Sequence, residues 1–199
     1  MSQARVDEAL KQYPLKTKLK NKAFTLRTMT LDDGPALQAF AKALPPHDLL
    51  FLRRDITKTE GINRWLDAVR RGAMHTILCE DAEGIVGYSS LHLTELDWSP
   101  HVADLRVMTA DRARGLGLGR LLTREAFNMA MALGIEKVVA RMTPDQTGAR
   151  SLFQELGFQP EALLKDEVKD RSGECHDLLI MACNVHTFLA QRKAFGVTA

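Results

Sequence analysis

A loop with three glycines at alternate positions constrains this chain more than any other feature of its sequence. The alternating segment 102–109 leads into the loop, and the pattern of residues 117–133 predicts a helix directly after it. Gly115, Gly117 and Gly119 allow positive φ and a close approach of the backbone to a ligand. Because the first turn of a helix presents unpaired N–H groups and a positive dipole end, the loop is suited to a phosphate or pyrophosphate.

The spacing of the glycines excludes two other phosphate-binding loops. No Gly-Lys pair occurs in the chain, so the GxxxxGK[ST] pattern is absent. The third glycine of a GxGxxG pattern would fall on Leu118 or Leu122. Arg114 and Arg120 would add positive charge beside the loop. On the loop alone, a tight glycine turn that binds no ligand is the alternative.

Apolar periodicity predicts the element order β-α-α-β-β-β-α-β-α-β-β. Two helices are expected between residues 30 and 72, the first with N-cap residues at 30–33 and the second starting at a capping box formed by Thr57 and Glu60. Two more helices are expected at 117–133 and 147–156. Strands are expected at residues 24–29, 75–79, 85–93, 102–109, 136–142, 161–169 and 175–183. A β-α-β crossover between hairpins predicts a mixed α/β sheet.

The two ends of the chain are expected to be extensions of one central domain. Residues 1–21 predict a short helix followed by a basic stretch, which is either a solvated arm or an electrostatic lure for an anionic ligand. Residues 185–199 predict a helical tail. Its apolar residues Phe188 and Leu189 could seal a homodimer or pack on their own sheet.

Composition excludes several other classes of protein. A formal net charge of +2 is too small to indicate nucleic-acid binding. Cys79, Cys175 and Cys183 form neither a disulfide framework nor a CxxC metal motif, so we expect small apolar residues and no metal. The charged first 14 residues do not read as a signal peptide, and no apolar run is long enough to cross a membrane. These features predict a cytoplasmic protein.

Two motifs resemble a known family. Arg114-Gly-Leu-Gly117-Leu-Gly119 resembles the [Q/R]-x-x-G-x-[G/A] signature of the GNAT superfamily of acyl-CoA-dependent N-acyltransferases. Ala149-x-x-Leu152-Phe153-x-x-x-Gly157-Phe158 resembles the second helix motif of that superfamily. The resemblance covers residues 22–184. It implies a mostly antiparallel sheet with flanking helices, in which the parallel strands 102–109 and 136–142 splay apart.

The resemblance also implies a reaction. The chain would transfer the acetyl group of acetyl-CoA, or another acyl-CoA, to a primary amine of a small molecule or peptide by direct attack in a ternary complex. By resemblance, the backbone of Val107, Met108 and Thr109 would bond the pantetheine arm and stabilise the charge on the thioester oxygen. The other cofactor-binding residues would be Arg114, Gly115, Leu116, Gly117, Leu118, Gly119 and Arg120 at the pyrophosphate, with Gln146 and Phe153 from the second motif.

This sequence departs from the family pattern at three positions. Gln146 replaces an asparagine, and Phe153 replaces a tyrosine whose hydroxyl protonates the departing thiolate in many relatives. Ala103 stands where many relatives carry a glutamate base. Asp104 could replace that base if a bulge rotates the strand, and His101 lies at the strand mouth with a suitable unperturbed pKa. A water chain, or an amine that arrives neutral, is the third option.

The loss of both usual proton-transfer residues leaves an alternative function, a non-catalytic acyl-CoA-sensing regulatory protein. If the chain is an enzyme, specificity for its acceptor is expected in residues 44–72. Arg53 and Arg54 could bind a carboxylate or phosphate on the acceptor, or form a solvated basic turn. Trp98 could line the acceptor mouth or cap the core.

Overall fold

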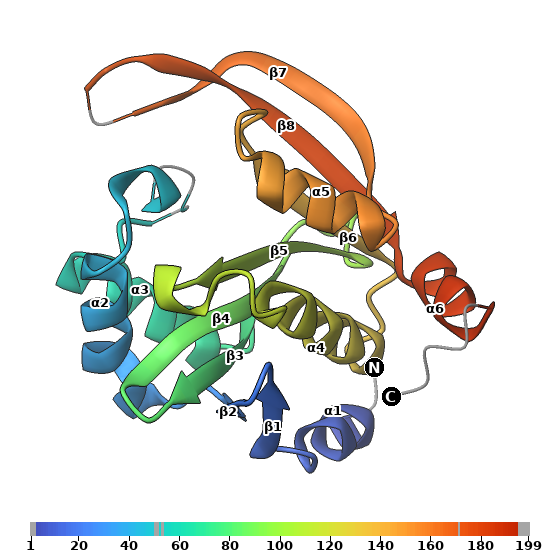
Figure 1. Ribbon diagram of the computed structural model, residues 1–199. Helices are drawn as coiled ribbons and strands as arrows, with labels where there is room; N and C mark the ends of the chain where they lie inside the picture. The colour runs from blue at the N-terminus through green and yellow to red at the C-terminus, as the bar shows by residue number, and fades with distance from the viewer. Residues whose placement is uncertain (1–2, 50–51, 53, 171, 195–199) are drawn as a thin grey trace.

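The fold is an eight-stranded mixed sheet with helices on both faces (Figure 1). The computed structural model describes residues 3–49, 52, 54–170 and 172–194. Within these residues the strand order is β1-β2-β3-β4-β5-β6-β8-β7, and only β5 and β6 pair in parallel. The predicted fold class, a mostly antiparallel sheet with one parallel pair, is therefore confirmed.

The observed elements follow the predicted order closely. The strands are β1 (Leu15–Leu19), β2 (Lys22–Thr28), β3 (Met74–Asp81), β4 (Gly84–Leu93), β5 (Val102–Thr109), β6 (Lys137–Met142), β7 (Gln159–Lys169) and β8 (Cys175–Asn184). The α-helices are α1 (Gln3–Leu10), α2 (Gly34–Lys42), α3 (Thr59–Arg70), α4 (Leu118–Ala132), α5 (Thr147–Glu155) and α6 (Val185–Ala194). Short 3-10 helices are η1 (Leu31–Asp33), η2 (Pro46–Leu49) and η3 (Asp111–Ala113).

The prediction of a solvated basic arm after α1 is wrong, because Leu15–Leu19 forms the edge strand β1. It pairs with β2 from Leu15 opposite Leu26 to Leu19 opposite Lys22. Lys16 and Lys18 are exposed and alternate with the half-buried Leu15, Thr17 and Leu19. Lysines on an edge strand discourage pairing with another sheet, so their presence does not argue against a strand.

The start of α3 also differs from the prediction. The helix begins at Thr59 with Lys58 at the N-cap, so the expected capping box of Thr57 and Glu60 does not form. Thr57 instead donates hydrogen bonds to Asp55 Oδ1 from its backbone N–H (3.1 Å) and its hydroxyl (2.5 Å). The hydroxyl of Thr57 is therefore used by the turn at Asp55 and not by the N-terminus of α3, because threonine side chains bond readily to groups close in sequence.

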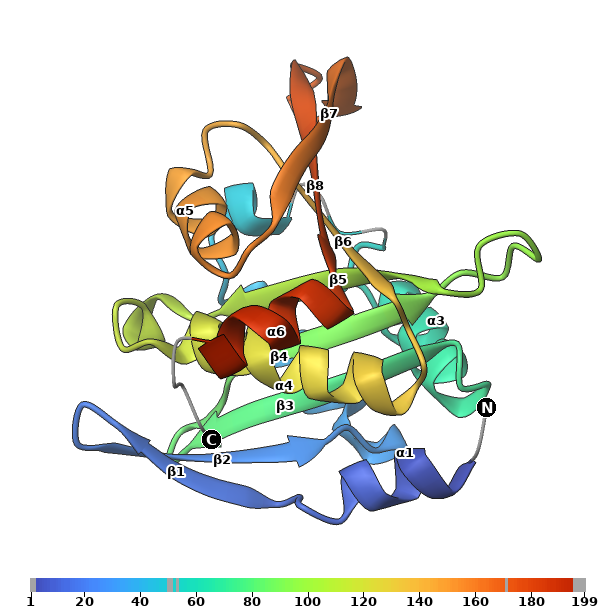
Figure 2. The same ribbon diagram turned by 90° about the vertical axis from the view of Figure 1, so that its right-hand side faces the viewer.

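Helices α1, α4 and α6 cover one face of the sheet, and α2 and α3 cover the other (Figures 1 and 2). Phe127 on α4 belongs to the hydrophobic core between α4, α6 and the sheet, and it stacks on Phe188 of α6 with ring centroids 4.0 Å apart. Phe188 thus packs on its own domain, whereas the side chain of Leu189 lies outside the described part of the structure. Tyr13 ties the N-terminal extension to α4, because its hydroxyl donates to the buried Glu125 at 2.9 Å.

Two of the three cysteines are buried as the sequence predicts, and the third is not. Cys79 and Cys183 are buried in strands, whereas Cys175 is exposed. Burial raises the pKa of Cys79 to about 12 and of Cys183 to about 11, as expected for inert structural thiols. Among the described residues, the helices are too short or too polar to span a membrane.

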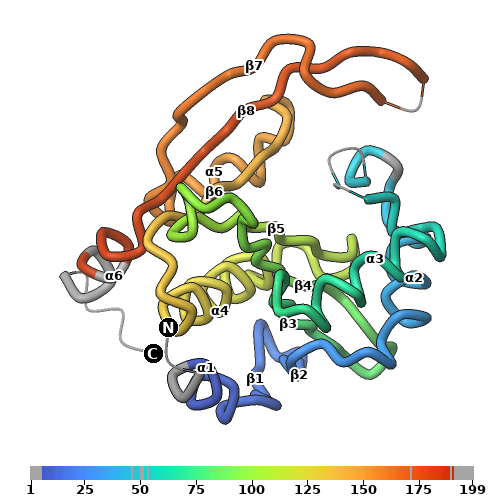
Figure 3. The backbone as a smooth tube through the Cα atoms, turned by 180° about the vertical axis from the view of Figure 1, so that it is seen from behind, coloured from blue at the N-terminus to red at the C-terminus, as the bar shows by residue number. Residues whose placement is uncertain are grey.

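Strands β5 and β6 pair over only the first half of β5 and then separate. Their parallel register runs from Val102 opposite Lys137 to Leu105 opposite Ala140 and ends there. Beyond this point β5 continues against β4 as far as Thr109, and β6 continues against β8 as far as Met142. Among the described residues, no strand lies beside one edge of residues 106–109, as expected for the predicted splayed pair. The tube in Figure 3 shows β6 leaving β5 to join the long β7–β8 hairpin.

Candidate active site

The glycine loop lies where the sequence predicts, between β5 and α4. Gly115 has φ 70° and Gly117 has φ 90°, and Gly117 is the N-cap of α4. A Cβ at either position would meet no atom of the described residues within 4 Å, so the loop is open on this side. The glycines are therefore needed for a left-handed backbone at a helix N-terminus, which leaves N–H groups available to an anion.

Charged side chains surround this loop. Lys20 Nζ donates to the carbonyl of Gly115 at 2.9 Å. Arg114 donates to Asp48, and Arg120 donates to Glu155. Both guanidinium side chains are about half exposed, 50% and 53%. Because exposed ion pairs contribute roughly 0–1 kcal/mol, an anionic ligand can compete for both arginines.

Helix η2 contacts both sides of the opening between β5 and β6. Asp48 meets Arg114 in the glycine loop, and His47 Nε2 lies 3.1 Å from Asp145 Oδ2 in the turn after β6. The same turn leads to Gln146, which is the N-cap of α5. Residues far apart in the sequence thus frame one opening.

The remaining residues predicted to bind the cofactor lie along this opening or next to it. Val107, Met108 and Thr109 lie on the part of β5 that β6 has left. Phe153 is only 6% exposed and packs against Phe158 with ring centroids 4.8 Å apart. Its ring belongs to the core, and the roles assigned to all these residues stay predictions.

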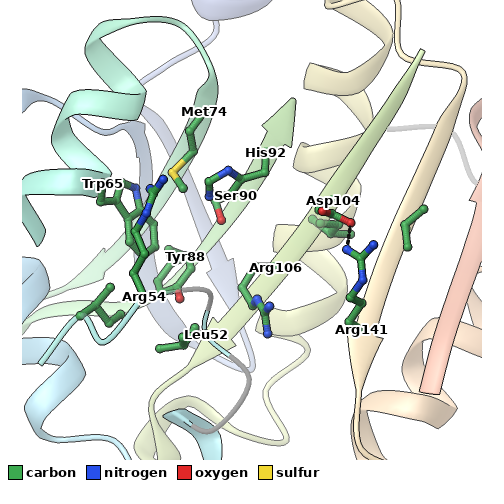
Figure 4. A pocket seen from close by; sticks show the side chains of 13 residues that line it. Leu52, Arg54, Trp65, Met74, Tyr88, Ser90, His92, Asp104, Arg106 and Arg141 are labelled. Carbon is green, nitrogen blue, oxygen red and sulfur yellow. Dashed lines mark hydrogen bonds and ion pairs between the residues drawn. The ribbon is translucent and has the colours of Figure 1, made fainter. Parts of the chain in front are cut away.

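A pocket lies on the sheet face that α2 and α3 cover, opposite α4, beside the point where β5 and β6 part (Figure 4). Its cavity volume is about 40 Å³. The lining combines apolar, aromatic and charged side chains from α3, from strands β3 to β6 and from the segment before α3. The lining residues are Leu52, Arg54, Ile56, Trp65, Met74, Tyr88, Ser90, His92, Asp104, Leu105, Arg106, Val139 and Arg141.

Asp104 lines the pocket without any distortion of its strand. The register between β4 and β5 runs without a shift from Gly87 opposite Thr109 to Leu93 opposite Ala103. Ala103 is buried in the core on the α4 side, so alternation turns its neighbour Asp104 to the other face. The expectation that a bulge must rotate the strand is therefore wrong. The carboxylate of Asp104 accepts a hydrogen bond from Arg141 on β6.

The other base candidate is not part of the pocket. His101 is exposed in the turn before β5, and its backbone carbonyl accepts the N–H groups of Glu136 (2.9 Å) and Lys137 (3.1 Å). Trp98, at 78% exposed, neither caps the core nor lines the pocket. Arg54 lines the pocket and donates to the carbonyl of Arg64 at 3.1 Å, whereas Arg53 lies outside the described residues.

Sequence reasoning missed several polar residues of the pocket. His92 lies opposite Asp104 in the β4–β5 register, and Arg106 lies opposite Ser90. Tyr88 is fully buried, and its ring makes edge contacts with Trp65 (5.0 Å) and Phe40 (6.0 Å). The signal was present as alternation, because Tyr88, Ser90 and His92 recur at every second position of one strand, as do Asp104 and Arg106 of the next.

Comparisons with known proteins agree on one family. The family model for the acetyltransferase (GNAT) family matches residues 39–158. The chain is 28% identical over 127 residues to the L-methionine sulfoximine/L-methionine sulfone acetyltransferase of Pseudomonas paraeruginosa, covering 61% of this chain and 71% of that relative. It is similar in structure to the ribosomal-protein-alanine N-acetyltransferase of Brucella melitensis, with a TM-score of 0.70, 26% identity and coverage of 80% and 98%. The spermidine N-acetyltransferase of Vibrio cholerae, in complex with CoA and spermine, has the same fold, with a TM-score of 0.70, 20% identity and coverage of 83% and 98%.

Proposed function

The chain belongs to the GNAT family of acetyltransferases, and from this premise we propose that it transfers the acetyl group of acetyl-CoA to a primary amine by direct attack in a ternary complex. One observation carries the proposal. The strands β5 and β6 separate after Leu105 and Ala140, with the glycine loop beyond the end of β5 and a pocket that contains charged side chains beside the point of separation. A cofactor bound along the free edge of β5 would meet an acceptor held in the pocket.

The cofactor half of the site fits an acyl-CoA. The open glycine backbone at the start of α4, with Arg114 and Arg120 beside it, suits a pyrophosphate. The unpaired edge of β5 offers backbone groups of Val107, Met108 and Thr109 to the pantetheine arm and the thioester. A backbone N–H aimed at the carbonyl oxygen stabilises the negative charge that develops there during attack.

The reaction moves one acetyl group and one proton. The nitrogen of the neutral amine attacks the thioester carbon, the C–S bond breaks, and CoA leaves as a thiolate. The nitrogen loses one proton, for which Asp104 and His92 are the candidate acceptors on the pocket lining, and His101 is the candidate outside it. Phe153 offers no proton to the thiolate, but a thiolate is a tolerable leaving group near neutral pH.

Two measurements on the full-length protein test this function. Acceptor-dependent release of CoA is measured with a panel of amines, and acetyl-CoA binding is measured by calorimetric titration. Gly117→Leu should abolish acetyl-CoA binding, because a side chain at φ 90° disturbs the loop and fills the open space beside it. Gly72→Leu is the matched control, since Gly72 also has a positive φ (69°) and open space but lies at the end of α3.

The outcomes separate the alternatives. Binding of acetyl-CoA with no turnover on any amine would favour an acyl-CoA-sensing regulatory role. The absence of both binding and turnover would mean that the loop is only a glycine turn.

A second set of variants assigns the base. Asp104→Asn and His92→Asn are compared with His101→Asn. A general base contributes about 10²–10⁴-fold, so loss of the true base should lower kcat at least a hundredfold and flatten the pH profile of kcat. The affinity for acetyl-CoA should not change. Equal kcat values in all three variants would favour a water chain or an acceptor that arrives neutral.

A further inference from the structure

The pocket lining carries more positive than negative charge. Among the described residues that line it, three are arginines, namely Arg54, Arg106 and Arg141, and one, Asp104, is a carboxylate. Arg141 donates to Asp104 across the β5–β6 pair, and the lining as a whole still has two more guanidinium groups than carboxylates. A partly enclosed cavity with this lining attracts an acidic group and repels a polycation.

Tyr88 adds a fixed polar group to the same cavity. The residue is fully buried, and its hydroxyl has no hydrogen-bond partner among the residues that the structure describes. Edge contacts with Trp65 and Phe40 hold the ring in place. Burial raises the pKa of Tyr88, and the charge of Arg106, which lines the same pocket, acts in the opposite direction. Because an unpaired buried hydroxyl costs roughly 1–3 kcal/mol, a ligand atom that accepts a hydrogen bond from it would remove that cost.

The size and the remaining lining limit the ligand further. A volume of about 40 Å³ holds roughly three water-sized groups at the 10–15 Å³ that one needs. The apolar part of the lining includes Leu52, Ile56, Met74 and Val139. The enclosed space therefore suits a short acidic group such as a carboxylate, bordered by apolar side chains, rather than a long chain or a folded peptide.

We propose that the acceptor is a small amino acid whose carboxylate is bound by Arg54, Arg106 and the Tyr88 hydroxyl. Its amine then faces Asp104 and His92, next to the point where β5 and β6 part. Guanidinium groups match a carboxylate with paired N–H donors, and Asp104 attracts the ammonium form of the amine before it loses a proton. Arg141 acts as a positioning residue that holds Asp104. This inference rests on the proposed acetyltransferase function and adds the substrate class.

Matched acceptors test the role of the carboxylate. Acceptor-dependent CoA release is measured for the twenty standard L-amino acids, and, for the best of them, for its amide and its decarboxylated amine. For L-leucine these partners are L-leucinamide and isopentylamine. Spermidine represents the polycations. We expect kcat/KM for the amino acid to exceed that of its amide and of its decarboxylated amine at least tenfold, although the amide has the more readily deprotonated amine.

Two substitutions connect that preference to the pocket. Arg106→Met should bring the amino acid and its amide within about threefold of each other. Tyr88→Phe keeps the ring contacts and should lower kcat/KM about tenfold for the amino acid and by a clearly smaller factor for the decarboxylated amine, which has no carboxylate to bind. Arg70→Met is the control, because Arg70 is an exposed arginine of α3 that pairs with Asp67 outside the pocket. It should leave all ratios unchanged. The affinity for acetyl-CoA should be the same in every variant, which checks that each one is folded.

The results distinguish failure of this inference from failure of the proposed function. Faster turnover of the amide, of the decarboxylated amine or of spermidine would overturn the amino-acid class and leave the acetyltransferase function intact. So would a carboxylate preference that survives Arg106→Met and Tyr88→Phe. No turnover of any amino acid despite tight acetyl-CoA binding would also overturn it. Failure to bind acetyl-CoA would instead contradict the proposed function itself.

Discussion

Gly61 determines how the segment that carries Arg54 and Ile56 packs against α3. A Cβ built at Gly61 would lie 2.0 Å from the backbone oxygen of Asp55 and 3.2 Å from the backbone nitrogen of Ile56. Real Cβ atoms essentially never come closer than 3.0 Å to such atoms. Gly61→Ala must therefore push this segment away from α3, since a backbone carbonyl cannot rotate aside as a side chain can.

The size of the effect follows from two opposing contributions. Alanine is a better helix former than glycine by about 1 kcal/mol. Overpacking a close contact costs about 1–3 kcal/mol, and an overlap with backbone belongs at the upper end of that range. The expected net loss is about 1–2 kcal/mol. For a chain of 199 residues this lowers Tm by roughly 2–8 °C, at about 2–4 °C for each kcal/mol.

Gly148→Ala is the matched control. Gly148 lies near the start of α5, as Gly61 lies near the start of α3, but a Cβ there meets nothing within 4 Å. This change should raise stability by about 0.5–1 kcal/mol. Thermal unfolding of both variants measures the difference. Gly61→Ala should also raise the acceptor KM, because Arg54 and Ile56 line the pocket, and should leave acetyl-CoA affinity unchanged. If Gly61→Ala were as stable as Gly148→Ala, the packing of residues 54–56 on α3 would be wrong.

Three further predictions follow from charged contacts. Asp48→Asn releases Arg114 from its ion pair and removes a negative charge beside the glycine loop. The change should strengthen acetyl-CoA binding by up to about fivefold in calorimetric titration at low salt. Weaker binding would refute this. Arg27 Nη2 lies 2.6 Å from Asp33 Oδ1 and 2.5 Å from Glu80 Oε1. Arg27→Met leaves both carboxylates without this partner and should lower the free energy of unfolding in urea by roughly 1–3 kcal/mol. An unchanged urea midpoint would contradict it. Burial raises the pKa of Asp33, but hydrogen bonds from Arg27 and Thr30 outweigh it and leave the pKa below the usual 3.8. The stability that this group contributes is present above pH 3.8 and is lost as the pH falls below it, so the difference between wild type and Arg27→Met should shrink from pH 6 to pH 3.

Much of the fold could be predicted because it depends on local chemistry. Gly115 and Gly117 permit a left-handed backbone wherever they stand, so the turn into α4 was visible in the sequence. The order of helices and strands followed from periodicity for the same reason. The edge strand β1 was missed because its alternate lysines resemble a solvated arm, and only the pairing of Leu15 with Leu26 distinguishes the two.

The candidate site likewise has parts that the sequence predicts and parts that only the tertiary structure decides. The sequence by itself determined the glycine loop before α4 and placed Asp104 beside Ala103 on a strand, because both depend on neighbouring residues. Only the tertiary structure decided that Asp104 meets Arg141, which is 37 positions away, and that Arg54 and Tyr88 share one pocket with them. Alternation along a strand fixes which side chains share a face, but it carries no information about what packs across that face. That depends on how β6 leaves β5 and on how closely the segment before α3 approaches Gly61, which are properties of the packed chain.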